Sequence, residues 1–86
     1  MVKQAVKIMS KSGLHLRPAS NLCKLAIEYE SNIIVKKGNG EYNAKSIISL
    51  LSSCTKEGDE VEVVCDGTDE SEALKAVIEY IEKSDW

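Results

Sequence analysis

One histidine, one arginine and one proline are present in the chain, and all three lie within residues 15–18. Proline fixes φ near the helical value and lacks an N–H group, so Pro18 suits the first turn of a helix. The unpaired N–H groups and the positive dipole end of a helix N-terminus favour an anion. Arg17 adds a planar set of donors that matches phosphate oxygens. Beside such an anion site, His15 is suited to carry a phosphoryl group.

Attack of His15 on phosphorus requires a neutral imidazole with a free lone pair. A helix N-terminus disfavours the imidazolium and favours the phosphorylated product. Phosphoryl transfer depends mainly on positioning and charge stabilisation, so a small domain can take part. Because the sequence contains no paired acid and base and no glycine-rich phosphate loop, we expect a carrier that receives the group from an enzyme and passes it to another protein. The alternatives are a structural His15 and a solvated Arg17.

Length and composition limit the classes of protein that this chain can represent. Its 86 residues predict one domain with a single core, and a net charge of −3 gives no general attraction for nucleic acid. No apolar run approaches the roughly 18 residues of a membrane span, and no signal peptide opens the chain, so we expect a cytoplasmic protein. Cys23, Cys54 and Cys65 are widely spaced without a Cys-x-x-Cys motif. They are interpreted as reduced, small apolar residues, with no metal site and no cofactor.

The elements that must position the motif follow from apolar spacing. Alternation predicts strands over residues 2–9 and 60–65, with Val64 on the polar side of the second one. Helical spacing predicts one helix over 18–30 and another that begins after Asp69 and ends near Lys83. Asp69 and Glu72 resemble a capping box for this last helix.

A hairpin and a short helix are predicted in the middle of the chain. The β-branched run at 33–35 predicts a strand over 32–37. Gly38-Asn39-Gly40 predicts a tight turn into a strand over 41–43, with Asn39-Gly40 the strongest hairpin signal. Ser46 is suited to cap a helix over 47–53. Four apolar residues lie in that helix, namely Ile47, Ile48, Leu50 and Leu51. A helix this short buries only part of such a set, so the remainder forms a docking patch unless all four belong to the core. Together the elements predict a two-layer α+β sandwich.

The segment Gly13-Leu14-His15-Leu16-Arg17-Pro18-Ala19 resembles the active-site motif of HPr, the histidine-containing phosphocarrier family of the bacterial phosphoenolpyruvate-dependent sugar phosphotransferase system. The resemblance extends over the chain in length, in element order and in Lys45-Ser46-Ile47. It implies one HPr-like domain over residues 1–86 with βαββαβα order. It also implies an open-faced sandwich, in which a four-stranded antiparallel sheet of order 1-4-2-3 carries its helices on one face.

The same resemblance implies partners and roles. Enzyme I would donate the phosphoryl group to the δ1 nitrogen of His15, and the IIA domains of sugar permeases would accept it. Ser46 matches the serine that HPr kinase/phosphorylase modifies, which lowers transfer from enzyme I and supports binding to the catabolite control protein. The positions implied for partner binding are Leu16, Lys24, Lys45, Ile47, Ile48 and Leu51. Without a partner, the two lysines would be ordinary surface residues and Ser46 a plain cap.

The chain departs from the family pattern at several positions. Leu16 stands where alanine is usual, Ser49 and Cys54 where glycine is common, and Ser53 where leucine is common. Two other functions are compatible with the sequence. One is an HPr-like paralogue in a nitrogen-related or other regulatory phosphorelay, and the other is a binding module with an incidental histidine. We expect a monomer that binds neither nucleic acid nor a membrane.

Overall fold

The computed structural model describes residues 1–9 and 16–83. The elements of this part of the chain are, in order, β1 (Val2–Lys7), α1 (Leu16–Ile27), β2 (Asn32–Lys37), β3 (Gly40–Asn43), α2 (Ile47–Ser52), β4 (Glu60–Asp66) and α3 (Glu70–Lys83). This order confirms the predicted one. The bounds differ most at β1 and α1, since β1 ends before Met9 and α1 begins before Pro18 and ends before Glu30. Among the described helices, none has the length and apolar character needed to cross a membrane.

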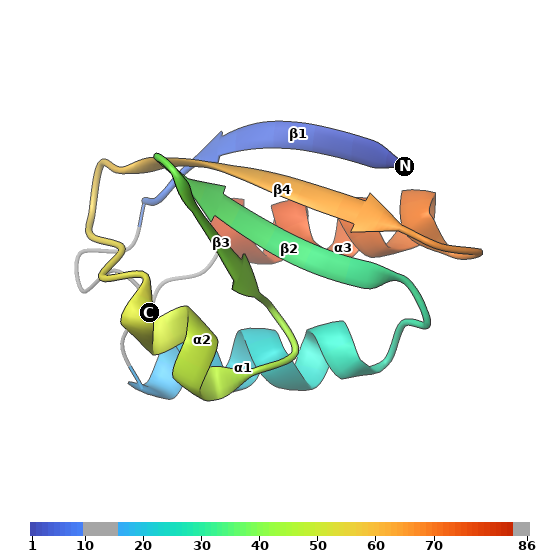
Figure 1. Ribbon diagram of the computed structural model, residues 1–86, viewed down its shortest axis with the longest axis horizontal. Helices are drawn as coiled ribbons and strands as arrows, with labels where there is room; N and C mark the ends of the chain where they lie inside the picture. Colours follow the sequence, from blue (N-terminus) through green and yellow to red (C-terminus); the bar gives the residue numbers. More distant parts are fainter. Residues whose placement is uncertain (10–15, 84–86) are drawn as a thin grey trace.

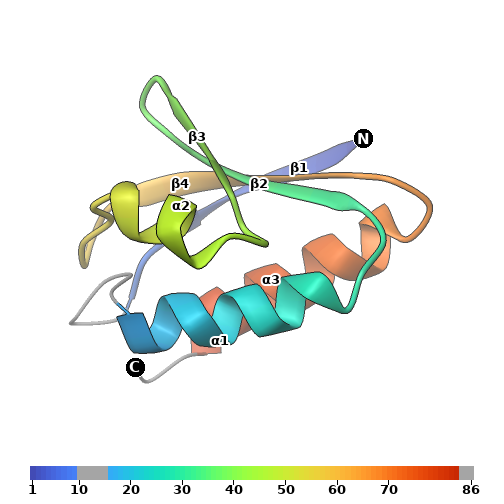
Figure 2. The ribbon, with the colours of Figure 1, turned by 60° about the horizontal axis from the view of Figure 1, so that its bottom comes forward.

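The four strands form one antiparallel sheet in the order β1-β4-β2-β3, as the family resemblance implied. β4 lies between β1 and β2, with Val6 opposite Val61 on one side and Val35 opposite Val63 on the other. Figure 1 shows the sheet in front of α3 and above α1. Turned by 60°, the sheet forms one layer and α1 and α3 the other (Figure 2). The fold is therefore the predicted two-layer α+β sandwich with an open sheet face.

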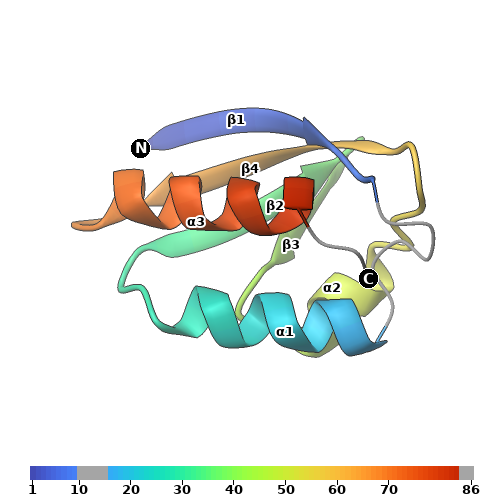
Figure 3. The same ribbon diagram turned by 180° about the vertical axis from the view of Figure 1, so that it is seen from behind.

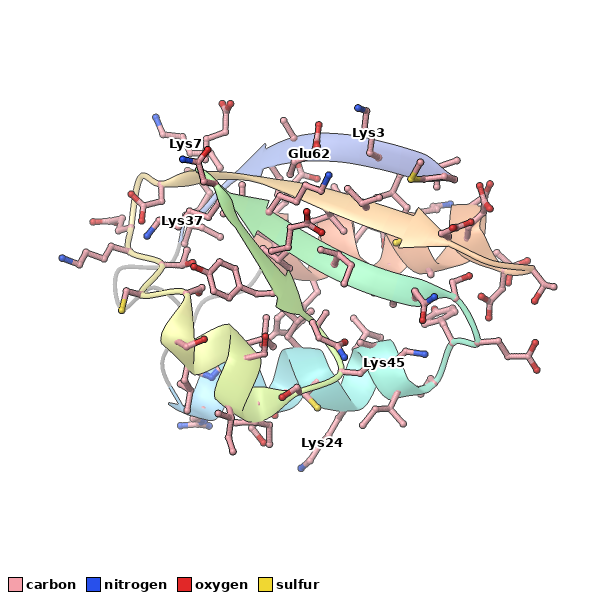
Figure 4. The ribbon with its side chains drawn as sticks, viewed as in Figure 1. Lys3, Lys7, Lys24, Lys37, Lys45 and Glu62 are labelled. Carbon is pink, nitrogen blue, oxygen red and sulfur yellow. The ribbon has the colours of Figure 1, made fainter. Side chains whose placement is uncertain are left out.

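The core lies between the sheet and the helices. Alternate residues of the strands point into it, and α1 and α3 each contribute an apolar stripe. Its buried members include Ile8, Leu22, Ile33, Val35, Leu50, Val61, Val63, Val77 and Ile81. The opposite face of the sheet carries charged side chains, among them Lys3, Lys7 and Glu62 (Figure 4). Alternation thus correctly placed Val6, Val61 and Val63 on the core face of the sheet.

Val64 is buried although it lies on the open face of the sheet. It pairs with Lys3 on β1 and with Ile34 on β2, and only 6% of it is exposed. Its position in the central strand β4 explains this burial, because neighbours flank it on both sides. The open face therefore has an apolar centre that the alternation pattern did not predict.

The hairpin between β2 and β3 turns within the predicted segment Gly38-Asn39-Gly40. Lys37 pairs with Gly40, so the two turn residues are Gly38 and Asn39. Gly38 has φ of +59, whereas Asn39 keeps a negative φ, as in a type II′ turn with glycine at its first central position. The predicted hairpin is therefore confirmed, although its two central residues are Gly38 and Asn39, and β3 begins at Gly40 and not at Glu41.

Asp69 precedes α3 as predicted, and the N–H of Ala73 donates to its carbonyl oxygen at 2.9 Å. Its carboxylate, however, accepts from the backbone N–H groups of Glu30 and Ser31 at 2.9 Å each, and from the Ser31 hydroxyl. The side chain thus joins the start of α3 to the connection between α1 and β2. The capping-box interpretation was wrong about what this side chain bonds.

Candidate functional site

The first turn of α1 carries the described part of the motif. The helix begins at Leu16, so Pro18 lies in its first turn, as predicted. Pro18 is fully buried and Arg17 is exposed, which leaves the guanidinium accessible to an anion or a partner. His15, the residue directly before this helix, and the side chain of Leu16 lie outside the described residues.

Tyr80 of α3 contacts this first turn from the neighbouring helix. Its hydroxyl donates to the carbonyl oxygen of Pro18 at 3.1 Å. Burial raises the pKa of the Tyr80 phenol above its usual value, against an opposing hydrogen bond with the Asn21 side chain. The sequence did not indicate this contact, because the two residues are 62 positions apart and local patterns do not predict contacts at such separations.

Ser46 caps α2 as predicted. Its side-chain oxygen accepts from the N–H of Ser49 at 3.2 Å, and its carbonyl oxygen accepts from the N–H of Leu50 at 3.0 Å. The Ser49 hydroxyl oxygen in turn accepts from the N–H of Asn43 at 2.9 Å. Ser49, where the family often has glycine, therefore joins the start of α2 to the end of β3.

The four apolar residues of α2 divide between the core and the surface. Leu50 is fully buried, and Ile47 and Leu51 are partly buried against the core. Ile48 is 81% exposed. The alternative that all four belong to the core is therefore wrong, and the exposed apolar surface of this helix consists mainly of Ile48.

The two lysines assigned to partner binding have different surroundings. Lys24 is exposed on α1 and extends away from the sheet (Figure 4). Lys45 is partly buried, and its ammonium donates to the carbonyl oxygen of Tyr29 at 2.7 Å, just after α1. A cation at a helix C-terminus is favourable because unpaired carbonyl groups face it. Lys45 thus has a structural role that the sequence did not indicate.

The end of α2 is held by a third lysine. The Lys37 ammonium donates to the carbonyl oxygens of Ser53 and Cys54 at 3.2 and 2.9 Å, and pairs with Asp59 at 3.0 Å. Cys54 follows the helix with φ of +51, and its N–H donates to the carbonyl oxygen of Leu51 at 3.3 Å. This is the left-handed position that often ends a helix and that glycine fills best.

The cysteines show no sign of a metal or disulfide site. All three are free, with Cys23 and Cys65 buried and Cys54 exposed. Burial raises the pKa of the Cys65 thiol to about 11, so this cysteine stays neutral. The apolar interpretation is confirmed for the two buried cysteines and is wrong for Cys54. Within the described ranges no group of three or more His, Cys, Asp or Glu could hold a metal ion.

Comparison with known proteins identifies the class to which this fold and motif belong. Residues 2–83 match the family model described as "PTS HPr component phosphorylation site". The chain is 37% identical to the HPr-like protein Crh of Halalkalibacterium halodurans over 96% of this chain and 99% of the relative. It is 40% identical to the phosphocarrier protein NPr of Escherichia coli K12 over 90% of this chain and 87% of the relative.

The fold also matches that of a solved structure closely. The crystal structure of HPr from Thermoanaerobacter tengcongensis superposes with a TM-score of 0.92 at 39% identity, covering 95% of this chain and 92% of that one. These likenesses define a bacterial phosphocarrier domain, in which the protein carries the phosphoryl group without being an enzyme. The chain belongs to the HPr family of the phosphotransferase system.

Proposed function

We propose that this chain accepts a phosphoryl group on His15 from enzyme I and passes it to the IIA domains of sugar permeases. In the first step a lone pair on the δ1 nitrogen forms the N–P bond while the bond between phosphorus and the donor breaks. In the second step the acceptor attacks the phosphorus and the N–P bond breaks. The group is only carried, so neither a cofactor nor a resident metal is required.

One observation above all supports this proposal. The helix N-terminus that directly follows His15 carries an exposed Arg17, within a chain that matches the family over residues 2–83. First-turn N–H groups and a guanidinium together stabilise the negative charge of the transferred group. We therefore assign Arg17 to contacts with the phosphate and the partner.

The proposal is tested by incubating the chain with enzyme I, magnesium and phosphoenolpyruvate, followed by intact mass measurement. We expect one acid-labile phosphoryl group per chain, and none in His15→Ala. Arg17→Lys should keep the group but slow its acceptance, because an ammonium cannot form the bidentate contact. Acid-labile phosphate in His15→Ala would overturn the assignment.

The proposed partner surface comprises Leu16, Lys24, Lys45, Ile47, Ile48 and Leu51. Ile48 supports it best, since 81% of this apolar residue is exposed, and an apolar centre with a polar rim is typical of docking sites. Ile48→Ala should weaken acceptance from enzyme I without loss of stability. Ile27→Ala is the matched control, because Ile27 is also exposed, at 61%, at the far end of α1. Equal effects of the two variants would contradict the patch.

Leu16 is a separate test of this surface, because its branched side chain adjoins His15 where alanine is usual. Leu16→Ala should change the efficiency of transfer from enzyme I while lowering stability by less than about 1 kcal/mol. A much larger loss of stability would mean that Leu16 belongs to the core and not to the partner surface.

We also propose Ser46 as a regulatory site for HPr kinase/phosphorylase, whose product would bind the catabolite control protein. A phosphate at this cap would face the N–H groups of α2 and adjoin the exposed Ile48. The fold should therefore stay intact while acceptance from enzyme I weakens through desolvation and repulsion. Ser46→Asp should reproduce both effects in thermal unfolding and phosphorylation rates. An unfolded variant would refute the cap, and an unchanged rate would leave Ser46 purely structural.

A second function is favoured by the names of the relatives. Crh and NPr are as similar to this chain as the HPr relatives are, so a regulatory phosphorelay, for example a nitrogen-related one, is the alternative to sugar uptake. Transfer from the phosphorylated chain to a panel of IIA domains separates the two. We further propose that the single domain over residues 1–86 acts as a monomer in the cytoplasm, which light scattering and cell fractionation test.

A further inference from the structure

Tyr80 joins the last helix to the turn on which the proposed transfer depends. Its hydroxyl donates to the carbonyl oxygen of Pro18 at 3.1 Å, and the Asn21 side chain is a second hydrogen-bond partner. Figure 3 shows α3 and α1 running along the same face of the sheet. A tyrosine hydroxyl is protonated at neutral pH and can donate this bond, and burial, which raises the pKa of the phenol, acts in the same direction.

Other side-chain hydrogen bonds hold α1 further along its length. The Cys23 thiol donates to the carbonyl oxygen of Lys45 at 3.2 Å, in the second half of the helix. The Lys45 ammonium donates to Tyr29, beyond its last turn. Both fix the C-terminal part of α1 to the segment before α2. The bond from Tyr80 acts at the opposite end, next to the exposed Arg17.

We propose that Tyr80 is a positioning residue for phosphoryl transfer, which it supports by fixing the Pro18 carbonyl and thereby the direction of the first turn. This inference rests on the proposed function of His15. The first-turn N–H groups and Arg17 stabilise a transferred group only if they point at it. Misplacement by about 1 Å can lower a reaction rate on the order of 100-fold. Loss of one hydroxyl from a packed ring leaves most of the helix in place, so we expect a decrease of about 3- to 10-fold.

Tyr80→Phe removes the hydroxyl and keeps the ring. We expect the maximal rate of phosphorylation by enzyme I to fall about 3- to 10-fold, with little change in the enzyme I concentration that gives half the maximal rate. A loosened first turn also weakens the positive dipole end beside His15. The pKa of His15, followed by NMR titration of the unphosphorylated chain, should therefore rise. The amide of Leu22, whose helical acceptor is the Pro18 carbonyl, should exchange faster with solvent.

Tyr42→Phe is the matched control. Tyr42 is a half-buried tyrosine on β3, the edge strand at the far side of the sheet from β1. Removal of its hydroxyl should change neither the rate nor the pKa of His15. If Tyr80→Phe lowers only the melting temperature and leaves the rate, the His15 pKa and the Leu22 exchange as in the wild type, Tyr80 is merely structural and the inference is wrong.

Failure of the proposed function is distinguishable from failure of this inference. A wild-type chain that enzyme I does not phosphorylate would overturn the proposed function alone. The NMR titration and the amide exchange need no donor, so they still decide whether Tyr80 orients the first turn.

Discussion

Replacing Cys54 by glycine should stabilise this protein. Among the described residues, Cys54 is the one non-glycine residue with positive φ, at +51. A side chain with Cβ in the left-handed region costs about 1–2 kcal/mol. Glycine removes that cost but adds about 0.4–1 kcal/mol of conformational entropy to the unfolded chain. From the midpoints of these ranges, the free energy of unfolding should rise by about 0.8 kcal/mol, or about 3–6 °C in Tm for a chain of this size.

The assay is urea and thermal unfolding under reducing conditions, followed by circular dichroism. Cys54→Ala is the control, because it removes the exposed thiol but keeps Cβ, and it should change stability by less than about 0.5 kcal/mol. Gly58→Ala is the reverse test, since Gly58 has φ of +88 in open space, and it should destabilise. A Cys54→Gly protein no more stable than Cys54→Ala would refute the reasoning from backbone strain.

Three further predictions concern the ties between elements. Lys45→Met should lower stability by about 1 kcal/mol in urea unfolding, because the carbonyl oxygen of Tyr29 loses its ammonium donor; an unchanged stability would mean that Lys45 has no structural role and serves only in partner binding. Gly67→Ala should cost about 2 kcal/mol, because its Cβ would lie 2.6 Å from the Cα of Ser31; a neutral result would mean that this close approach relaxes easily. Asp69 has its pKa lowered below the ordinary 3.8, chiefly by the Ser31 hydroxyl, so its contribution is present above that value and is lost as pH falls through the lower folded pKa. Thermal unfolding should accordingly be less sensitive to acid below about pH 4 in Asp69→Asn, and an unaltered acid profile would contradict this assignment.

The sequence predicted those parts of the fold that depend on local spacing. Alternation identified β1 and β4, and helical periodicity identified α1 and α3, because burial on one face imposes those periods. β2, β3 and α2 were identified by a β-branched run, a turn signal and a cap. Pro18 correctly located the first turn of α1, because a proline just before an amphipathic run is favoured at a helix start and disfavoured inside a helix. The same local arguments correctly assigned Ser46 as a cap, since its bond to Ser49 closes within one turn.

Contacts between residues that are far apart in the sequence could not be predicted from local spacing. The Asp69 carboxylate bonds to residues 38 and 39 positions away, so the nearby Glu72 suggested the wrong partner. The two central residues of the β2–β3 turn are Gly38 and Asn39, and not the Asn39-Gly40 pair with the strongest local signal, because Lys37 pairs with Gly40. The sequence likewise gave no sign that Lys45 would lie against the end of α1, although it correctly indicated that part of α2 stays exposed.

The distribution of these side-chain bonds suits a domain that exposes the end proposed for phosphoryl transfer and keeps its fold. Asp69 and Glu30 join the α1–β2 connection to the β4–α3 connection, and Figure 1 shows both connections at the end of the molecule away from the first turn of α1. Arg17 in that first turn and Ile48 in α2 are exposed and contribute little to the core. We expect substitutions at these two residues to alter the proposed transfer with little effect on stability, and substitutions at the far end to lower stability with little effect on transfer. Tyr80 should affect both stability and transfer, because its ring is partly buried against the core while its hydroxyl bonds to Pro18 in the first turn of α1.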